Sequence, residues 1–249
     1  MQIKKLIIPF IAVIVCLAAA GCKKDSQNTK VYLLKQQVTD DREDGIPIDT
    51  TTYSYDEKDR ITGITDGSGT GRITMSIVYD SQNRISVARK YNSTGGLIIE
   101  FDFFYDGGDA GYYFFGPTHI ADTASLTFNN ARQVTEISTK HSGSQVFTYD
   151  SKGNIATSQA ISSSGSSHLN DQISFSYDAG KNPLSQAAPN NYFVMYIINT
   201  TNPSTFINNV LIKNADKYTY TYNKDGFPVS LTIKTYLSKI YVYYTYIQK

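Results

Sequence analysis

The stretch Tyr53-Ser-Tyr-Asp-Glu-Lys-Asp-Arg-Ile61 contains the pattern that decides the fold. A segment of alternating residues ends in Tyr-Asp, a short polar stretch follows, and a second segment begins with an aliphatic residue. An acid at a strand end can accept hydrogen bonds from the turn backbone, and a Gly or Asn in the turn supplies a positive φ. The stretch therefore predicts a β-hairpin.

The same pattern recurs along the chain at intervals of roughly 21–28 residues, with one interval near twice that length. Copies occur at 77–85, 147–155 and 220–229, a weaker one occurs at 126–134, and 103–106 and 175–178 carry the aromatic-Asp ending alone. A period in this range indicates a repeat architecture. The composition agrees, because 20 Tyr, 12 Phe and no Trp stand beside abundant Ser, Thr, Asn and Gly, as expected for strands and turns.

Each strand should have one apolar and one polar face. In 72–80 the apolar face carries Ile73, Met75, Ile77 and Tyr79, and in 228–235 Val229, Leu231 and Ile233 alternate with Ser230, Thr232 and Lys234. An outer-membrane barrel should instead show an apolar outward band with aromatic girdles. The hairpins could form a linear or spiral array or a closed barrel, and closure removes every strand edge. We therefore predict an all-β, soluble, antiparallel up-and-down barrel of about 12–16 strands.

The segment 181–214 interrupts this rhythm. Its central part, Tyr192-Phe-Val-Met-Tyr-Ile-Ile198, is dense in large apolar side chains and lacks clear alternation. Pro189 precedes it and Asn199 follows it, which are boundary signals for a short helix. We predict an insert with a short helix near 190–198 that packs on or into the barrel.

The N-terminus has the pattern of an exported lipoprotein. Lys4 and Lys5 precede an apolar run over 6–20, and Ala19-Ala20-Gly21-Cys22 is similar to a bacterial lipobox. The apolar run is shorter than the roughly 20 residues of a transmembrane helix. We predict a signal peptide over 1–21, lipid attachment at Cys22, a polar tether over 22–30 and a single barrel domain over 31–249. The cell envelope is then the expected location, with the lipid in the outer membrane and the barrel on its periplasmic or exterior face.

The net charge and the cysteine content of the mature chain argue against several classes of function. Cleavage removes two lysines and no acid, so the formal charge moves from 23 − 22 = +1 to 21 − 22 = −1. A near-neutral chain disfavours nucleic-acid binding and polybasic membrane docking. Cys16 leaves with the signal, and the remaining Cys22 is used for lipid, so neither a disulfide nor a cysteine metal site is expected.

The candidate chemical groups mostly have structural explanations. His119, His141 and His168 lack metal-ligand spacing and are interpreted as loop histidines without partners. The strand-end acids could form a ring of carboxylates, but their repeated position favours turn capping: Asp56, Asp80, Asp106, Asp150 and Asp178. Asp40–Asp44 could bind Ca²⁺ weakly but lacks a known loop spacing, and the glycine-rich 66–71 is interpreted as a hairpin loop. We expect no catalytic residue, metal or cofactor, and hence no enzyme.

The turns also carry a resemblance. Residues 220–229 and the Tyr177-Asp178 copy followed by Lys181-Asn-Pro-Leu184 resemble a family of uncharacterised bacterial lipoproteins with YD-like repeats. The resemblance covers the mature chain and implies a porin-like barrel, but it implies no active site.

Three functions stay open at this point. A barrel of this width is too wide for ordinary side chains to fill, so Tyr, Phe, the insert, water or a ligand must occupy the lumen. Tyrosines that line a wet cavity favour a binding protein for a glycan or another small ligand in or near the lumen. The alternative is a structural or assembly module that contacts envelope proteins, and a hydrolase with an unrecognised site is the third possibility.

Overall fold

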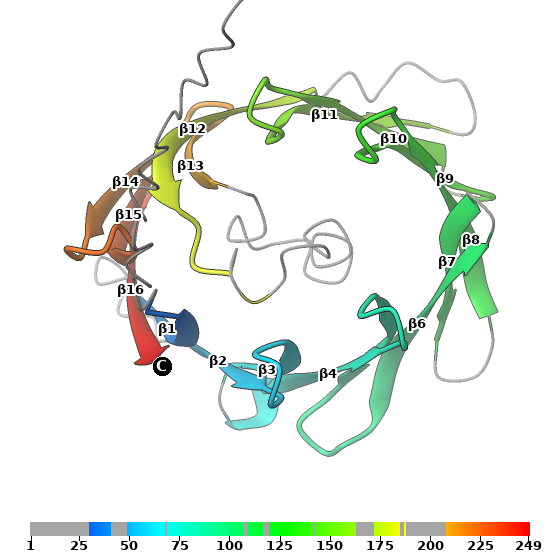
Figure 1. Ribbon diagram of the computed structural model, residues 1–249, viewed down its shortest axis with the longest axis horizontal. Coiled ribbons are helices and arrows are strands. Elements are labelled where there is room, and N and C mark those ends of the chain that lie inside the picture. The colour runs from blue at the N-terminus through cyan, green and yellow to red at the C-terminus, as the bar shows by residue number, and fades with distance from the viewer. Residues whose placement is uncertain are drawn as a thin grey trace, which may run out of the picture. The chain divides into compact units, whose positions relative to one another are not determined.

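The computed structural model describes residues 30–40, 49–67, 69–106, 109–116, 120–141, 143–162, 172–184, 187 and 208–249. These residues form a closed barrel of sixteen strands (Figure 1). The strands are β1 (Tyr32–Asp40), β2 (Asp49–Tyr55), β3 (Ile61–Asp66), β4 (Ile73–Tyr79), β5 (Ile85–Tyr91), β6 (Leu97–Asp106), β7 (Asp109–Phe115), β8 (Ile120–Phe128), β9 (Val134–Thr139), β10 (Gly143–Tyr149), β11 (Ile155–Ile161), β12 (Ile173–Lys181), β13 (Asn208–Lys213), β14 (Asp216–Tyr222), β15 (Pro228–Lys234) and β16 (Lys239–Gln248). A single turn of 3-10 helix, η1 (Gly69–Gly71), lies between β3 and β4.

Each strand pairs antiparallel with the strands before and after it in the sequence, and β1 pairs with β16 to close the ring. The closing pair is long, since its register runs from Tyr32 opposite Gln248 to Asp40 opposite Tyr241. This confirms the predicted all-β up-and-down barrel, at the upper end of the expected strand number. Within the described residues, no helix is long and apolar enough to cross a membrane.

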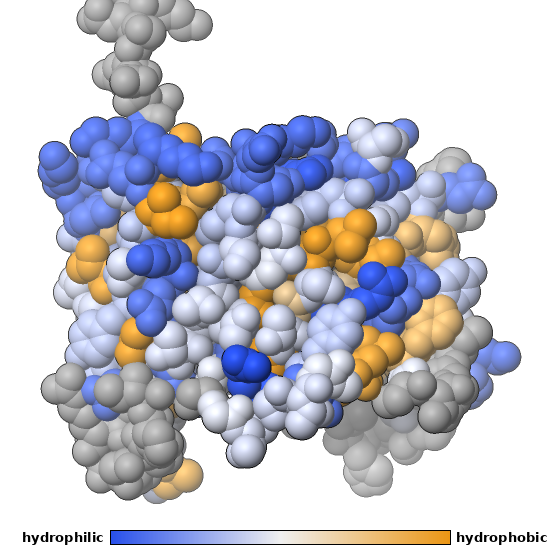
Figure 2. Space-filling model, turned by 90° about the horizontal axis from the view of Figure 1, so that it is seen from below, coloured by the Kyte–Doolittle hydropathy of each residue, from blue (hydrophilic) through white to orange (hydrophobic). Residues whose placement is uncertain are grey.

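The two ends of the barrel differ. We call the end where β1 starts and β16 stops the terminal end, and the opposite end the distal end. The predicted Tyr-Asp turns between β2 and β3, β4 and β5, β8 and β9, β10 and β11, and β14 and β15 all lie at the terminal end. Figure 2 shows a strongly hydrophilic rim along this end of the wall.

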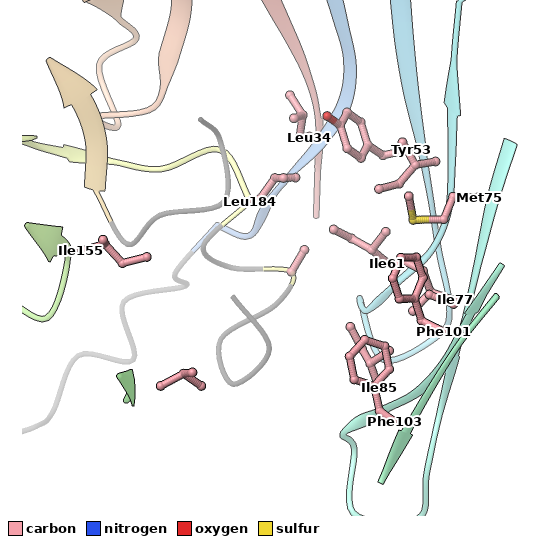
Figure 3. Packing of buried hydrophobic residues seen from close by; sticks show 14 of the residues in the cluster. Leu34, Tyr53, Ile61, Met75, Ile77, Ile85, Phe101, Phe103, Ile155 and Leu184 are labelled. Atoms are coloured by element: carbon pink, nitrogen blue, oxygen red, sulfur yellow. The ribbon is translucent and has the colours of Figure 1, made fainter. Parts of the chain in front are cut away.

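The apolar core lies on the inner face of the wall. Leu34, Ile61 and Ile85 are fully buried, and Leu34, Tyr53, Met75 and Phe101 project inward from their strands (Figure 3). The outer face is rich in exposed hydroxyl side chains: Ser54, Ser125, Thr127, Thr148, Ser174, Ser176, Thr219 and Thr221. On the face in Figure 2, apolar side chains form separate patches among polar ones. The outer face therefore mixes exposed hydroxyl groups with apolar side chains such as Val78 and Ile98.

The structure modifies the predicted insert. Asn208–Lys213 forms β13, so this part of the segment 181–214 belongs to the wall. At the other end of the segment, Leu184 and Ala187 are 2% and 3% exposed and belong to the same buried cluster as the inner wall. The helix expected near 190–198 lies outside the described residues.

One predicted side-chain orientation was wrong. Val229 was expected to share the apolar face with Leu231, but it is 38% exposed, whereas Pro228 is buried. The register explains this difference, because Tyr222 pairs with Pro228 and Thr221 pairs with Ser230, which leaves Val229 as the extra residue of a β-bulge.

Candidate functional site

The terminal-end turns account for most of the strand-end acids. In the first turn, one carboxylate oxygen of Asp56 accepts the backbone N–H groups of Lys58 and Arg60, both at 3.0 Å. Asp80 and Asp150 repeat this arrangement with the residues two and four positions later. Although burial opposes ionisation, these hydrogen bonds and the Arg60 side chain hold the pKa of Asp56 below its usual value. The turn-capping role is confirmed for these three acids.

The other two acids behave differently. Asp106 stands opposite Asp109 at the end of the β6–β7 hairpin. Asp178 lies within β12 instead of at a turn, where it accepts the N–H of Gly180 at 2.8 Å and the hydroxyl of Tyr222. Burial raises the pKa of Asp178, and hydrogen bonds from Gly180 and Asn209 oppose this rise. The predicted identical place of all five acids was therefore wrong for Asp178.

The tyrosines of the inner face link neighbouring hairpins. The hydroxyl of Tyr79 donates to the carbonyl of Ile61 at 2.8 Å, and the same type of bond occurs in five further places. These pairs are Tyr55 with Leu34, Tyr105 with Ile85, Tyr149 with Val134, Tyr177 with Ile155 and Tyr246 with Pro228. Arg60 stacks on the Tyr79 ring and Arg84 on the Tyr105 ring, at 4.3 and 4.2 Å from the ring centres. These groups already have partners, so they hold the wall together and do not form a ring of binding groups.

Aromatic side chains gather on both faces of β6 and β7. On the inner face, Phe101, Phe103 and Tyr112 pack with ring centres 5.5–6.3 Å apart. Each of these rings is less than a tenth exposed. Little of their surface can contact a ligand, so the inner face works as a packed core at this position.

The outer face of the same two strands carries a second aromatic group that is accessible. The ring of Tyr113 lies 5.2 Å from that of Phe104 and 6.4 Å from that of Phe115, and Tyr113 is 41% exposed. Gly111 makes room for this arrangement. A Cβ atom there would stand 2.4 Å from the Phe104 ring and 2.2 Å from the carbonyl oxygen of Ala124, so only glycine allows the Phe104 ring to lie over the backbone.

Charged groups border these rings on the same face. Asp102 stands opposite Tyr113 and Glu100 opposite Phe115, while Arg89 on β5 forms an ion pair with Glu100. Burial, together with the charge and hydrogen bonding of Glu100, raises the pKa of Asp102. We call Phe104, Tyr113 and Phe115 with Arg89, Glu100 and Asp102 the outer aromatic platform. It combines apolar ring surface with carboxyl and guanidinium groups at its edge.

A polar pair lies on the inner face beside β7. Asp122 of β8 stands opposite Phe114 and accepts the Thr123 N–H at 2.8 Å. His141 contacts the same carboxylate through its backbone N–H at 3.2 Å and its ring Nδ1 at 3.1 Å. The prediction that His141 lacks a partner was wrong. Burial opposes ionisation of Asp122, but these bonds outweigh it and lower its pKa.

The other candidates from the sequence are possible metal ligands and a glycine-rich loop. Within the described ranges, no group of three or more His, Cys, Asp or Glu residues could hold a metal ion. The segment 66–71 connects β3 and β4, which confirms its interpretation as a hairpin loop. Cys22, His119, His168 and most of Asp40–Asp44 lie outside the described residues.

The sequence reasoning missed the outer aromatic platform because it assigned the aromatic side chains to the inner face. A usable signal was present at Phe104, since the equivalent position in most other copies carries Ser or Thr, as at Ser54, Thr148, Ser176 and Thr221, with Val78 as the other apolar case. The orientation of Phe104 and Tyr113 required the register, which shifts at bulges along the barrel.

Comparison with known proteins adds a fold relationship. No protein-family model matches the sequence, and no curated protein gives a significant match. The solved structures similar to this chain include a porin-like protein from Bacteroides uniformis, with 13% identity, a TM-score of 0.52, and coverage of 86% of this chain and 98% of that one. A porin-like protein from Bacteroides vulgatus has 10% identity, a TM-score of 0.38, and coverage of 87% and 99%.

A further match is a crystal structure of a TcdB2–TccC3–Cdc42 complex, with 13% identity and a TM-score of 0.20. It spans 77% of this chain but only 9% of the matched chain. The first match therefore shows a porin-like barrel fold, and the other two carry no argument. The protein has the fold of a porin-like sixteen-stranded barrel.

Proposed function

We propose that this protein is a lipid-anchored, non-enzymatic protein of the cell envelope that binds glycans through the outer aromatic platform. The observation that carries the proposal is the group of Phe104, Tyr113 and Phe115 on an outer face otherwise rich in Ser and Thr. Exposed aromatic rings stack against the apolar C–H faces of sugar rings, and neighbouring polar groups bond the sugar hydroxyls.

Glu100, Asp102 and Arg89 supply those polar groups. Glu100 and Asp102 belong to β6 and stand opposite Phe115 and Tyr113, so acceptors border the rings on one side. The guanidinium of Arg89, already paired with Glu100, supplies further donors. A ligand with both an apolar face and many hydroxyls fits this combination better than a purely apolar ligand does.

The proposed place of binding differs from the sequence expectation, which put the ligand in or near the lumen. The inner rings at the same level are less than a tenth exposed, whereas Tyr113 is 41% exposed. At this level of the wall, the most exposed aromatic side chain is therefore on the outer face, which supports the platform as the proposed site.

The proposal is tested by titrating the chain 23–249 with soluble neutral and acidic oligosaccharides in a calorimeter and on a glycan array. We expect Tyr113→Ala to weaken binding by roughly tenfold or more, because aromatic contacts dominate such interfaces. Tyr243→Ala is the matched control, since Tyr243 is also on the outer face and is 40% exposed. Failure of the unmodified chain to bind any oligosaccharide, or equal binding by Tyr113→Ala, would refute the proposed site.

The envelope location rests on the Lys4–Cys22 pattern and has its own test. Cys22→Ser should abolish incorporation of labelled palmitate and release the protein from the membrane fraction. A Cys22→Ser protein that keeps both the label and the membrane would show that the lipid is attached elsewhere. The polar outer face supports a tethered barrel that does not span the bilayer.

The structural-module alternative has a weaker basis in the exposed apolar side chains of other strands, such as Ile161 at 47% and Ile212 at 41%. Single exposed apolar residues are normal on protein surfaces. Cross-linking in cells that captures one envelope protein through these residues, with no oligosaccharide bound in vitro, would favour this alternative.

A further inference from the structure

The hairpin between β15 and β16 ends in two large apolar side chains that have no contact with the core. Tyr236 is 98% exposed and Leu237 is 87% exposed, far above any other large apolar residue described. The hairpin lies at the distal end, because β16 runs from there to Gln248 at the terminal end. We call Tyr236 and Leu237 the distal tip.

The tip has a defined conformation. The backbone N–H of Thr235 donates to the carbonyl of Ser238 at 3.0 Å, which closes a four-residue turn. The Thr235 hydroxyl oxygen accepts the N–H groups of Leu237 and Ser238 at 3.2 and 2.9 Å. Tyr236 and Leu237 therefore occupy the two corner positions of a fixed turn, and their side chains are held out from the barrel.

These residues are unusual for such a turn. Two-residue hairpin loops prefer Asn, Asp or Gly at the corner positions, because these residues suit the turn backbone. Other turns of this chain follow such rules, with glycine at Gly95, Gly153 and Gly226 where φ is positive. Neither Tyr236 nor Leu237 has a positive φ, so the turn backbone does not itself demand Gly or Asn here. The unusual feature is that two large apolar side chains are exposed without any gain in packing, which indicates a functional site.

Three lysines stand beside the tip. Lys217 of β14 is opposite Lys234 of β15, and Lys234 is opposite Lys239 of β16, so the three lie in one row across neighbouring strands. Like charges directly opposite each other destabilise a sheet. The nearest acids in the registers are Asp216, which stands opposite Lys213, and Asp40, which stands opposite Tyr241. The three lysines therefore form a cationic surface beside the apolar distal tip.

We propose that the distal tip and its lysine row dock on the surface of an anionic phospholipid membrane. Leu237 enters the boundary of the acyl chains, Tyr236 takes the interfacial position that tyrosines favour, and the lysines face the anionic headgroups. A soluble polyanion would use the lysines but leave the two apolar side chains in water. The combination of both features thus favours a lipid surface.

The topology makes this contact distinct from the proposed lipid anchor. The polypeptide enters the barrel at Val31, whose N–H bonds to the Lys249 carbonyl at the terminal end. The tip is at the opposite end of the wall. The tip therefore provides a second membrane contact, which is independent of both Cys22 and the outer aromatic platform.

Vesicle co-sedimentation of the unlipidated chain 23–249 tests the proposal. This chain contains the whole barrel, because β1 and β16 close it within Val31–Lys249. We expect binding to phosphatidylcholine vesicles that contain about a third phosphatidylglycerol, and much weaker binding to phosphatidylcholine alone. The double variant Tyr236→Ser/Leu237→Ser should lose roughly tenfold or more of the binding.

Two matched controls separate the contributions. Lys217→Gln/Lys234→Gln/Lys239→Gln should abolish the preference for phosphatidylglycerol, whereas Lys58→Gln/Lys152→Gln/Lys224→Gln, the same charge change in exposed terminal-end turns, should keep it. Val78→Ser/Ile98→Ser removes two exposed apolar side chains of the outer wall and should also bind normally. Unchanged melting temperatures show that each variant is folded.

A spectroscopic measurement shows whether the tip enters the lipid. The chain has no Trp, so Tyr236→Trp introduces a single reporter. A blue shift of its emission and quenching by brominated lipids are expected with phosphatidylglycerol vesicles. Binding without a blue shift, equal binding to heparin in the absence of lipid, or binding that the tip variant retains would each overturn the proposal.

Discussion

At the residue scale, the hydroxyls of six inner-face tyrosines link neighbouring hairpins. Tyr79 reaches from β4 to the carbonyl of Ile61 on β3, which is adjacent to a bulge where the ladder is interrupted. The hydroxyl satisfies this acceptor within the core, where an unpaired carbonyl would be costly. Phenylalanine has no hydroxyl and could not donate this hydrogen bond, which explains why most copies of the repeat carry Tyr. Two of the five terminal-end turns differ: Phe128 has no hydroxyl, and the hydroxyl of Tyr222 donates to the Asp178 carboxylate.

We therefore expect Tyr79→Phe to lower the free energy of unfolding by about 1–2 kcal/mol, because it leaves the Ile61 carbonyl without its donor. Tyr243→Phe, on the exposed outer face, should change it by less than about 0.5 kcal/mol. Urea denaturation of both variants checks this. An equal effect of the two substitutions would show that the hydroxyl of Tyr79 contributes no specific stability.

Burial also makes the tyrosines sensitive to alkaline pH. Desolvation raises the pKa of Tyr79, Tyr105 and Tyr112 from 10.0 to about 12. The unfolded chain then loses these protons first, so stability is fully present below pH 10.0 and falls as the pH rises towards about 12. The tyrosinate absorbance of a buried tyrosine, measured as the difference between the unmodified chain and Tyr79→Phe, should appear together with loss of β-sheet circular dichroism. Ionisation of these tyrosines near pH 10 in a chain that stays folded would contradict the expectation.

At the element scale, each Tyr-Asp hairpin is a turn combined with a bulge. The second residue of the second strand is the extra residue in five hairpins: Thr62, Ser86, Thr135, Ala156 and Val229. Because of this extra residue, the first two inward-pointing side chains of the second strand are three residues apart instead of two, as at Ile61 and Ile64. Simple alternation predicts the strands but places Val229 on the wrong face.

The stability of each turn should depend on its capping acid and on the residue that adopts a positive φ. Asp80→Ala removes the acceptor of two backbone N–H groups and of the Arg84 side chain, and should lower the free energy of unfolding by about 1–2 kcal/mol. Ser81→Ala, at an exposed position in the same turn, should be near neutral. Asn83→Val should also destabilise, because the φ of Asn83 is 62° and β-branched residues avoid that region.

The pH dependence of this turn follows from its hydrogen bonds. Burial opposes ionisation of Asp80, but its bonds to Arg84 and Gln82 hold its pKa below 3.8. The contribution of the Asp80 carboxylate to the stability of the fold is therefore present above pH 3.8. It is lost as the pH falls through the lower pKa that Asp80 has in the folded chain. The stability difference between the unmodified chain and Asp80→Ala should shrink on acidification, which acid titration of both proteins in urea would reveal. A constant difference would show that the carboxylate charge is not involved.

At the scale of the whole molecule, closure is the decisive feature. The β1–β16 pair leaves no free edge in the described wall, and Val31 and Lys249 exchange two backbone hydrogen bonds at 3.2 and 3.0 Å. Because the first and last residues of the barrel, Val31 and Lys249, are adjacent, the order of the strands can be rearranged without changing their neighbours. The ring should tolerate a new break in an exposed turn but not the loss of a strand.

A circular permutant that joins Lys249 to Val31 through a short Gly-Ser linker and begins at Gly95 should therefore fold with a β-sheet spectrum like that of the parent. Gly95 lies in the exposed β5–β6 turn, where a break interrupts no strand pair. Deletion of 239–249 removes β16, exposes the edges of β1 and β15, and should produce aggregation in size-exclusion chromatography. A monomeric, folded deletion variant would show that closure is not required.

The sequence alone determined the hairpins, the turn acids and the all-β barrel, because these depend on local turn chemistry and on alternation within a few residues. It also supplied the N-terminal lipoprotein pattern, which is a linear signal. The tertiary structure decided which face each aromatic occupies, that Asp178 lies in a strand, that His141 meets Asp122, and that 208–213 belongs to the wall. These features depend on register, and each bulge shifts the register by one residue, so that side chains beyond it change faces. The outer aromatic platform and the lysine row of the distal tip exist only because the strands align in this register.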